Sequence, residues 1–184
     1  MGRDKALLKY RNSTFLNHIL EVFLERLDPV VVVLGHNENI IRASIRTDLI
    51  SGANAKKVKV VVNPQYSEGM LSSLQVGIAA LPGRVNAVMF TLVDHPDVQE
   101  STLDKMLITH RKTDAQLVIP RNGGRHGHPV VATRSILHEI AKLPARASPK
   151  EVIHRNRHDT LFLDVNDTGV LRDIDTPEEY GKLL

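Results

Sequence analysis

Two aspartates stand in Asp-x-Pro turns, where their carboxylates are available for chemistry on phosphate groups. Asp94 follows an apolar segment, and Asp175 lies near the end of the chain. Hard divalent cations prefer oxygen ligands, and a Mg²⁺ ion held by two such carboxylates can also bind the phosphates of a nucleotide. The alternative is structural: Asp94 or Asp97 caps the helix expected near Ser101, and Asp175 or Thr176 caps the last helix.

A glycine and two serines form a second candidate site. Gly69 permits close approach of the backbone to a ligand, and Ser72 and Ser73 place hydroxyl and N–H groups at the expected start of a helix. This geometry suits the polar edge of a base or an anion. A generic Gly-Ser loop is the alternative.

The stretch 121–129 mixes glycines, cations and imidazoles, which predicts a flexible lid over an anionic substrate. Arg125 and His128 are its candidate substrate-binding residues. Residues Gly127, His128 and Pro129 could instead shape a turn into a strand. Zinc is not expected, because the chain has no Cys and no helical His pair completes a ligand set.

These segments follow the strands of an expected α/β fold, a Rossmann-like, mainly parallel sheet covered by helices on both faces. Buried β-branched runs such as 30–34 alternate with segments of helical spacing. In open sheets of this kind, ligands bind outside the carboxyl ends of the strands. We expect strands at 30–34, 58–62, 87–92, 116–119 and 160–165, and helices at 14–27, 38–49, 71–80, 101–112, 134–142 and after Pro177.

The composition bounds the class of protein. The 184 residues are 42% hydrophobic and 24% charged, which predicts one globular domain over 1–184. No apolar run is long enough to span a membrane and the start lacks a signal peptide, so we expect a cytoplasmic protein. The net charge of +3 comes from scattered residues, so no nucleic-acid partner is expected.

Five ordered motifs together resemble the MobA-like nucleotidyltransferases, and among them most closely the molybdenum cofactor cytidylyltransferases. The motifs are Met1-Gly2-x-x-Lys5-x-Leu7-Leu8, Asn63-Pro64 through Gly69-Met70-x-Ser72-Ser73-Leu74, Asp94-x-Pro96, Gly127-His128-Pro129 and Asp173-Ile174-Asp175-Thr176-Pro177-Glu178-x-Tyr180. The resemblance implies transfer of CMP from CTP to molybdopterin, with release of pyrophosphate. It also implies a molybdoenzyme or its accessory proteins as partners.

The resemblance implies a role for each motif. Lys5 would contact the triphosphate, Gly69, Ser72 and Ser73 would lie by the base, and Asp94 and Asp175 would hold Mg²⁺. His128 and Arg125 would lie near the phosphate of the acceptor.

One departure concerns the start of the chain, which falls within the phosphate loop of the family. The family's first strand and its L-A-A-G-x-S-x-R segment are absent from the sequence, which predicts an empty sheet position and a true start upstream of Met1. The alternatives to the CMP transfer are a guanylyltransferase or sugar-phosphate nucleotidyltransferase of the same fold, or an accessory protein with impaired catalysis that binds the cofactor.

Overall fold

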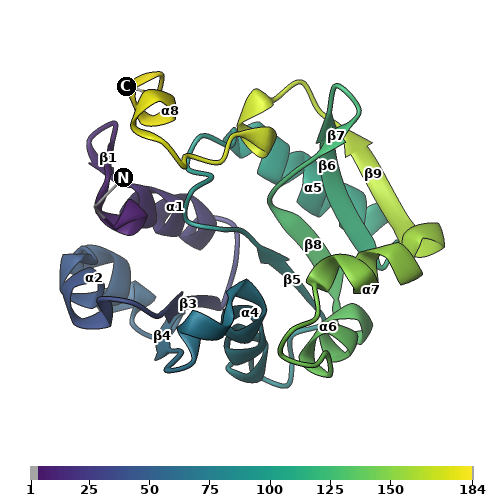
Figure 1. The fold of residues 1–184 in the computed structure, drawn as a ribbon, viewed down its shortest axis with the longest axis horizontal. Coiled ribbons are helices and arrows are strands. Elements are labelled where there is room, and N and C mark those ends of the chain that lie inside the picture. The colour runs from purple at the N-terminus through teal and green to yellow at the C-terminus, as the bar shows by residue number, and fades with distance from the viewer. Residues whose placement is uncertain (1–3, 184) are drawn as a thin grey trace.

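The computed structural model describes residues 4–183 as an α/β fold, which confirms the predicted class (Figure 1). Met1 and Gly2 of the first motif lie outside these residues. The α-helices are α1 Phe15–Leu24, α2 Glu38–Ser44, α3 Thr47–Ile50, α4 Met70–Ala79, α5 Glu100–Lys112, α6 Arg134–Ala141, α7 Pro149–Arg155 and α8 Pro177–Gly181. Short 3₁₀ helices are η1 Lys5–Leu7, η2 Gly52–Asn54, η3 Tyr66–Glu68, η4 Arg157–Asp159 and η5 Thr168–Leu171.

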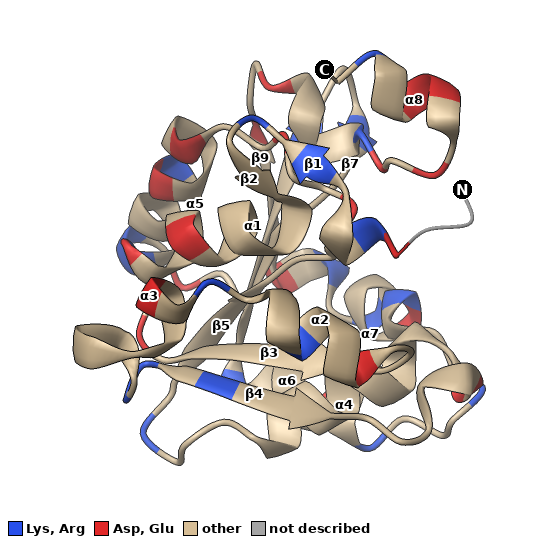
Figure 2. Ribbon diagram, turned by 90° about the vertical axis from the view of Figure 1, so that its left-hand side faces the viewer, with Lys and Arg blue, Asp and Glu red and all other residues tan. Residues whose placement is uncertain are grey.

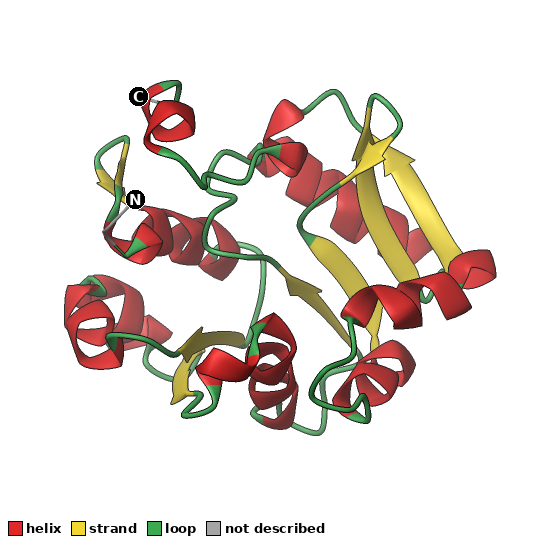
Figure 3. Ribbon diagram, in the orientation of Figure 1, coloured by secondary structure: helices red, strands yellow, loops and turns green. Residues whose placement is uncertain are grey.

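The strands form three sheets, two of which carry the fold (Figure 3). They are β1 Lys9–Tyr10, β2 Ser13–Thr14, β3 Val30–Leu34, β4 Val58–Val62, β5 Ala87–Phe90, β6 Leu117–Asn122, β7 Arg125–His126, β8 Val130–Thr133 and β9 Thr160–Asp164. β3 and β4 pair in parallel as a two-stranded sheet, and β5, β8, β6, β7 and β9 form a five-stranded sheet. β1 and β2 make a small hairpin.

The five-stranded sheet is mixed, which differs from the mainly parallel arrangement expected. β8 pairs antiparallel with both β5 and β6, whereas β9 pairs in parallel with β6. The reason is that residues 123–129 are too few for a crossover helix between β6 and β8, so the chain must turn back. β5, β6 and β9 therefore still run in one direction, and their carboxyl ends lie at the same edge.

Alternating side chains of the large sheet pack against helices on both faces. Leu117, Ile119 and Ala132 contact the face covered by α4, α6 and α7. Val118 and Val131 point to the other face, against α5 and the end of α1. β6 and β8 are buried on both sides over most of their length, which explains their continuous apolar runs in the sequence.

The predicted helix over 38–49 is interrupted, giving α2 and α3. The buried side chain of Asn17 accounts for the break, because its amide donates to the carbonyl of Ser44 at 2.9 Å. The Asn17 carbonyl oxygen also accepts from the Arg46 N–H at 3.0 Å. These bonds satisfy backbone groups that a continuous helix would have paired.

Gly127 lets η5 lie directly against the turn that leads into β8. A Cβ atom at Gly127 would overlap the carbonyl oxygen of Val170, and the neighbouring His128 N–H donates to this oxygen at 2.8 Å. The predicted lid over 121–129 is thus β7 and a packed turn. The alternative, that these residues shape a turn into a strand, describes the structure.

We expect Gly127→Ala to lower the free energy of unfolding by about 3 kcal/mol, because the backbone of η5 must move to admit the methyl group. Urea unfolding followed by circular dichroism measures the change. Gly83→Ala is the matched control, since a Cβ there meets no atom within 4 Å. Equal free energies of unfolding for the two variants would show that η5 can move to admit the methyl group without loss of stability.

Candidate active site

Lys5 brings together the two aspartates that the sequence places 81 residues apart. Its Nζ donates to Oδ2 of Asp94 at 2.8 Å and to Oδ1 of Asp175. Lys5 lies in η1, Asp94 in the loop after β5 and Asp175 in the segment after η5. Three separate segments thus meet at one ammonium group.

Asp94 is held in place by its backbone while its carboxylate stays available. Its carbonyl oxygen accepts from the Ile174 N–H at 3.0 Å, which ties the loop after β5 to the segment that carries Asp175. The side chain is 17% exposed, and its Oδ1 is buried without a hydrogen-bond partner among residues 4–183. Neither Asp94 nor Asp97 caps α5.

The start of α5 is held instead by a distant residue, Asp167. This buried carboxylate accepts from the Gln99 N–H at 2.9 Å and from the Thr102 hydroxyl at 2.8 Å, and its other oxygen accepts from the Gly169 N–H. The structural alternative for Asp94 therefore does not describe this fold. Sequence reasoning missed Asp167, since no local pattern links it to a helix that begins 67 residues earlier.

The cap of α8 is likewise made without the carboxylate of Asp175. Thr176 and Glu179 form a capping box, in which the Thr176 hydroxyl accepts from the Glu179 N–H and the Glu179 carboxylate accepts from the Thr176 N–H. Glu179 also accepts from the Asp175 N–H at 2.8 Å. The acidic first turn of α8 (Figure 2) thus fixes the backbone of Asp175 and leaves its side chain to Lys5.

The charges of this group stabilise one another. Burial lowers the pKa of Lys5, but its hydrogen bonds to Asp175 and Asp94 outweigh this effect and raise the pKa overall. The hydrogen bond from Lys5 in turn lowers the pKa of Asp175. Lys5 and Asp175 therefore favour each other's charged forms.

A second set of contacts fixes the same loops from the other side. Asp97 accepts from the Tyr10 hydroxyl at 2.8 Å and pairs with the guanidinium of Arg172. Burial and the bond to Asp97 raise the pKa of Tyr10 to about 12. Arg172 was not predicted as a site residue, and its role here is to join η5 to the loop after β5.

The loop between β4 and α4 is organised by a buried asparagine. The Asn63 amide donates to the hydroxyls of Ser72 at 2.8 Å and Ser73 at 3.0 Å, and its carbonyl accepts from the Gln65 N–H. The Ser72 hydroxyl lies within 2.8 Å of the carbonyl of Gly69. Ser72 is thus occupied in holding the loop, while Ser73 keeps its hydroxyl proton free of protein partners in the contacts of the described chain.

Gly69 itself leaves open space before α4. Its φ of +109° is in the region that favours glycine, and a Cβ there would meet no atom within 4 Å. Asn37 connects this side of the molecule to η1, since its amide donates to the Asp4 carboxylate at 3.0 Å. The loop after β3 therefore lies beside the segment that carries Lys5.

Two histidines lie behind Asp94. The rings of His95 and His128 are 4.9 Å apart, and Nε2 of His95 is 3.9 Å from Oδ1 of Asp94. The Nδ1 atoms of both rings are buried without partners in the described structure. His128 thus contacts His95, and His95 lies beside Asp94. His95 was not among the site residues predicted from the sequence.

Arg125, the other residue predicted to bind the acceptor, is not brought to this group. It lies exposed in β7, paired across the hairpin with Asn122. No contact joins its side chain to Lys5, Asp94 or Asp175 within residues 4–183. The packed turn at Gly127 fixes β7 away from them.

Burial, together with the neighbouring His95, lowers the pKa of His128 to about 4. Between pH 6.5 and 4 the unfolded chain then binds a proton that the folded chain does not, so stability falls as the pH falls through this window. We expect a loss on the order of 2 kcal/mol that His128→Gln reduces. Urea unfolding from pH 7.5 to 4.5 measures it, with the exposed His138→Gln as control. A parallel pH dependence in both variants would contradict the prediction.

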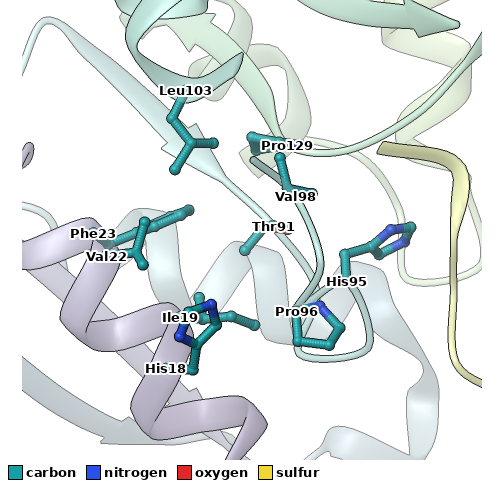
Figure 4. Close-up of a pocket in the computed structure, with 10 residues that line it drawn as sticks. All are labelled: His18, Ile19, Val22, Phe23, Thr91, His95, Pro96, Val98, Leu103 and Pro129. Atoms are coloured by element: carbon teal, nitrogen blue, oxygen red, sulfur yellow. The ribbon is translucent and has the colours of Figure 1, made fainter. Parts of the chain in front are cut away.

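A small cavity next to His95 does not serve as the substrate site. It lies between α1 and the loop after β5, has a volume of about 20 Å³ and is lined mainly by apolar side chains (Figure 4). This volume admits about one water molecule. The cavity is therefore too small to hold a substrate.

The donor set fits a divalent cation. Two carboxylates converge on one positive charge, and Asp94 keeps a buried oxygen free. In the part of the chain that the structure describes, no group of three or more His, Asp or Glu side chains is arranged around a metal. Mg²⁺ commonly takes one or two carboxylates and completes its shell with water and substrate phosphates, so two aspartates are enough.

The fold is α/β, and Lys5 joins the carboxylates of Asp94, after β5, and Asp175, after η5. The chain matches the MobA-like NTP transferase domain over residues 1–160 and belongs to this family. No helix within residues 4–183 has the length and apolar character to cross a membrane.

Proteins similar to this chain carry the names of different activities. Nicotine blue oxidoreductase of Paenarthrobacter nicotinovorans is 31% identical over 100% of this chain and 90% of its own. Molybdenum cofactor cytidylyltransferase of Escherichia coli K12 is 20% identical over 98% of this chain and 86% of its own. The crystal structure of Rv0371c from Mycobacterium tuberculosis H37Rv aligns with this chain with a TM-score of 0.81 and 28% sequence identity. The alignment covers 100% of this chain and 90% of that chain. A second structure of Rv0371c is a complex with manganese, with a TM-score of 0.75, 28% identity, and coverage of 100% of this chain and 92% of that one.

Proposed function

We propose that the protein is a Mg²⁺-dependent nucleotidyltransferase that transfers CMP from CTP to the phosphate of a molybdopterin-type acceptor and releases pyrophosphate. The observation that carries the proposal is the convergence of Asp94 and Asp175 on a single positive charge. The manganese complex of Rv0371c supports a divalent metal in a related protein. Membership of the MobA-like family supports the class of reaction.

The residues of the site account for each requirement of the transfer. Asp94 and Asp175 would hold the metal, which neutralises charge on the triphosphate. Lys5 adds a positive charge beside the same phosphates. The acceptor phosphate is already an anion at neutral pH, so it needs no general base, and it attacks the α-phosphorus in line as the bond to pyrophosphate breaks. The protein acts by positioning and by charge.

The loop from Asn63 to Ser73 is proposed to face the base. Gly69 leaves room for close approach, and the Ser73 hydroxyl is the side-chain donor available there, whereas Ser72 supports the loop. His128 would act from behind Asp94, and Arg125 would reach the acceptor only by its exposed guanidinium. A molybdoenzyme partner, a single domain over 1–184 and a cytoplasmic location remain predictions.

The proposal is tested by pyrophosphate release. The purified protein is incubated with Mg²⁺, molybdopterin and each nucleoside triphosphate, and we expect release with CTP. Preferential turnover of GTP would instead assign the protein as a guanylyltransferase, and preferential use of a sugar phosphate as acceptor would assign it as a sugar-phosphate nucleotidyltransferase. The absence of pyrophosphate with every triphosphate, in Mg²⁺ and in Mn²⁺, would refute nucleotidyl transfer.

The 31% identity to nicotine blue oxidoreductase supports a second candidate, an oxidoreductase activity. The test is the oxidation of NADH or NADPH, followed by absorbance, with a planar heteroaromatic dye and EDTA. Dye reduction that persists without a divalent metal would favour this activity over transfer. We expect no turnover in EDTA.

A further inference from the structure

Two large apolar side chains are exposed beside Gly69, although hydrogen bonds organise the loop before α4. Tyr66 is 43% exposed and Met70 is 51% exposed. The buried Asn63, 1% exposed, bonds to both ends of this loop, at Gln65 and at Ser72. Tyr66 and Met70 are therefore exposed on a loop whose two ends are tied to the buried Asn63.

Tyr66 is placed by the end of β3. A Cβ atom at Gly35 would lie 2.6 Å from the Cβ of Tyr66, so only glycine lets η3 approach this closely. The Tyr66 hydroxyl lies 3.3 Å from Nδ1 of His36, and the two rings are tilted by 54° with centroids 5.8 Å apart. The ring is therefore held at one edge and leaves part of its surface to solvent.

The position connects Tyr66 to the proposed chemistry. η3 and α4 follow β4, whose carboxyl end lies beside that of β3, and Figure 1 shows α4 beside β3. His36 is followed by Asn37, which bonds to Asp4 next to Lys5. A flat ligand on Tyr66 would thus have its polar groups toward Gly69 and Ser73 and its phosphates toward Lys5.

From this geometry we infer that Tyr66, with Met70 beside it, is a stacking surface for a planar heteroaromatic ring of a substrate. Rigid aromatic side chains give large contact area at little cost in conformational entropy, and the thioether of Met adapts to a flat partner. The inference rests on the proposed function for the identity of the ring, which belongs either to the nucleotide base or to the acceptor.

Because the chain has no tryptophan, Tyr66→Trp introduces a single fluorescent reporter at this surface. We expect its emission to be quenched by a nucleoside triphosphate, if the base stacks, or by a pterin, if the acceptor does. Inorganic tripolyphosphate, which has no ring, should leave the emission unchanged. Ile108→Trp is the matched control, since Ile108 is 50% exposed on α5, on the other face of the large sheet.

Steady-state kinetics of Tyr66→Leu assign the ring. We expect KM to rise about tenfold for CTP if the base stacks, or for the acceptor if its ring stacks, with kcat changed little. Tyr66→Phe should keep the wild-type KM, because stacking does not need the hydroxyl.

Two outcomes would overturn the stacking surface: unchanged emission of the Tyr66→Trp variant with every ring compound, or quenching that tripolyphosphate or the Ile108→Trp control reproduces. Quenching in the Tyr66→Trp variant without pyrophosphate release by the wild-type protein would retain the surface and reject the proposed transfer. The two proposals therefore fail separately.

Discussion

Asp94→Asn should reduce kcat/KM for nucleotidyl transfer by about a thousandfold, because it removes the least exposed charge of the proposed metal site. The amide keeps the shape of the side chain and can still accept from Lys5. It cannot supply the negative charge that a divalent cation needs. The rate of pyrophosphate release at saturating Mg²⁺ measures the loss.

The matched control is Asp97→Asn, three residues further along the same loop. Asp97 bonds to Tyr10 and Arg172, away from Lys5, so its replacement should cost about 1 kcal/mol of stability and leave transfer within tenfold. Thermal unfolding of both variants separates the two effects. If Asp94→Asn kept more than a tenth of wild-type activity, Asp94 would not be a metal ligand.

The same variant distinguishes an enzyme from an accessory protein that binds the cofactor. A carrier would bind molybdopterin equally well before and after the Asp94→Asn substitution and would show no transfer in either form. Equilibrium binding of molybdopterin, measured alongside pyrophosphate release, therefore tests both alternatives with one pair of proteins.

Local patterns in the sequence predicted most of the elements. The run of β-branched residues at 30–34 became β3 with the same bounds, because a strand buried on both faces needs no polar alternation. The helix at 149–155 was missed although Ser148-Pro149 and Glu151 form a capping box with proline in its first turn. That signal was in the sequence and predicts a helix start.

Contacts between distant residues were beyond sequence reasoning. The rule that ligands bind at the carboxyl ends of strands selected the loops of Asp94 and Asp175, and these loops do meet. Their connection through Lys5 and the Ile174 N–H depends on the packing of η5, which no local pattern specifies. The same limit explains why Ser72, predicted to face a ligand, is used by the buried Asn63.

β8 confirms one of the two alternatives for residues 121–129. The turn into a strand at Gly127, His128 and Pro129 describes the structure, with the apolar run Val130–Thr133 as that strand, and the lid does not. Gly123 and Gly124 both have positive φ and form the tight turn between β6 and β7. Two adjacent glycines between short apolar runs are typical of a hairpin, which reverses the chain and makes the sheet mixed.

Lys5→Gln should change catalysis and metal binding in opposite directions. Without nucleotide, the Lys5 ammonium occupies the position between Asp94 and Asp175 and competes with a cation for the same oxygens. Its removal should strengthen binding of Mn²⁺ alone by about tenfold. The repulsion between two positive charges near a surface is a few kcal/mol at short range, and solvent screens most of this energy. Transfer should fall by about a hundredfold, because the triphosphate loses a positive charge.

Titration calorimetry with Mn²⁺ and pyrophosphate release measure the two effects on one preparation. Lys9→Gln is the matched control, because Lys9 is exposed in β1 and its loss should change neither quantity. Weaker Mn²⁺ binding in Lys5→Gln would mean that Lys5 organises the carboxylates for the metal instead of competing with it. Unchanged Mn²⁺ binding with unchanged transfer would show that Lys5 is not part of the active site. The ion pairs of Lys5 with Asp94 and Asp175 would then be only structural.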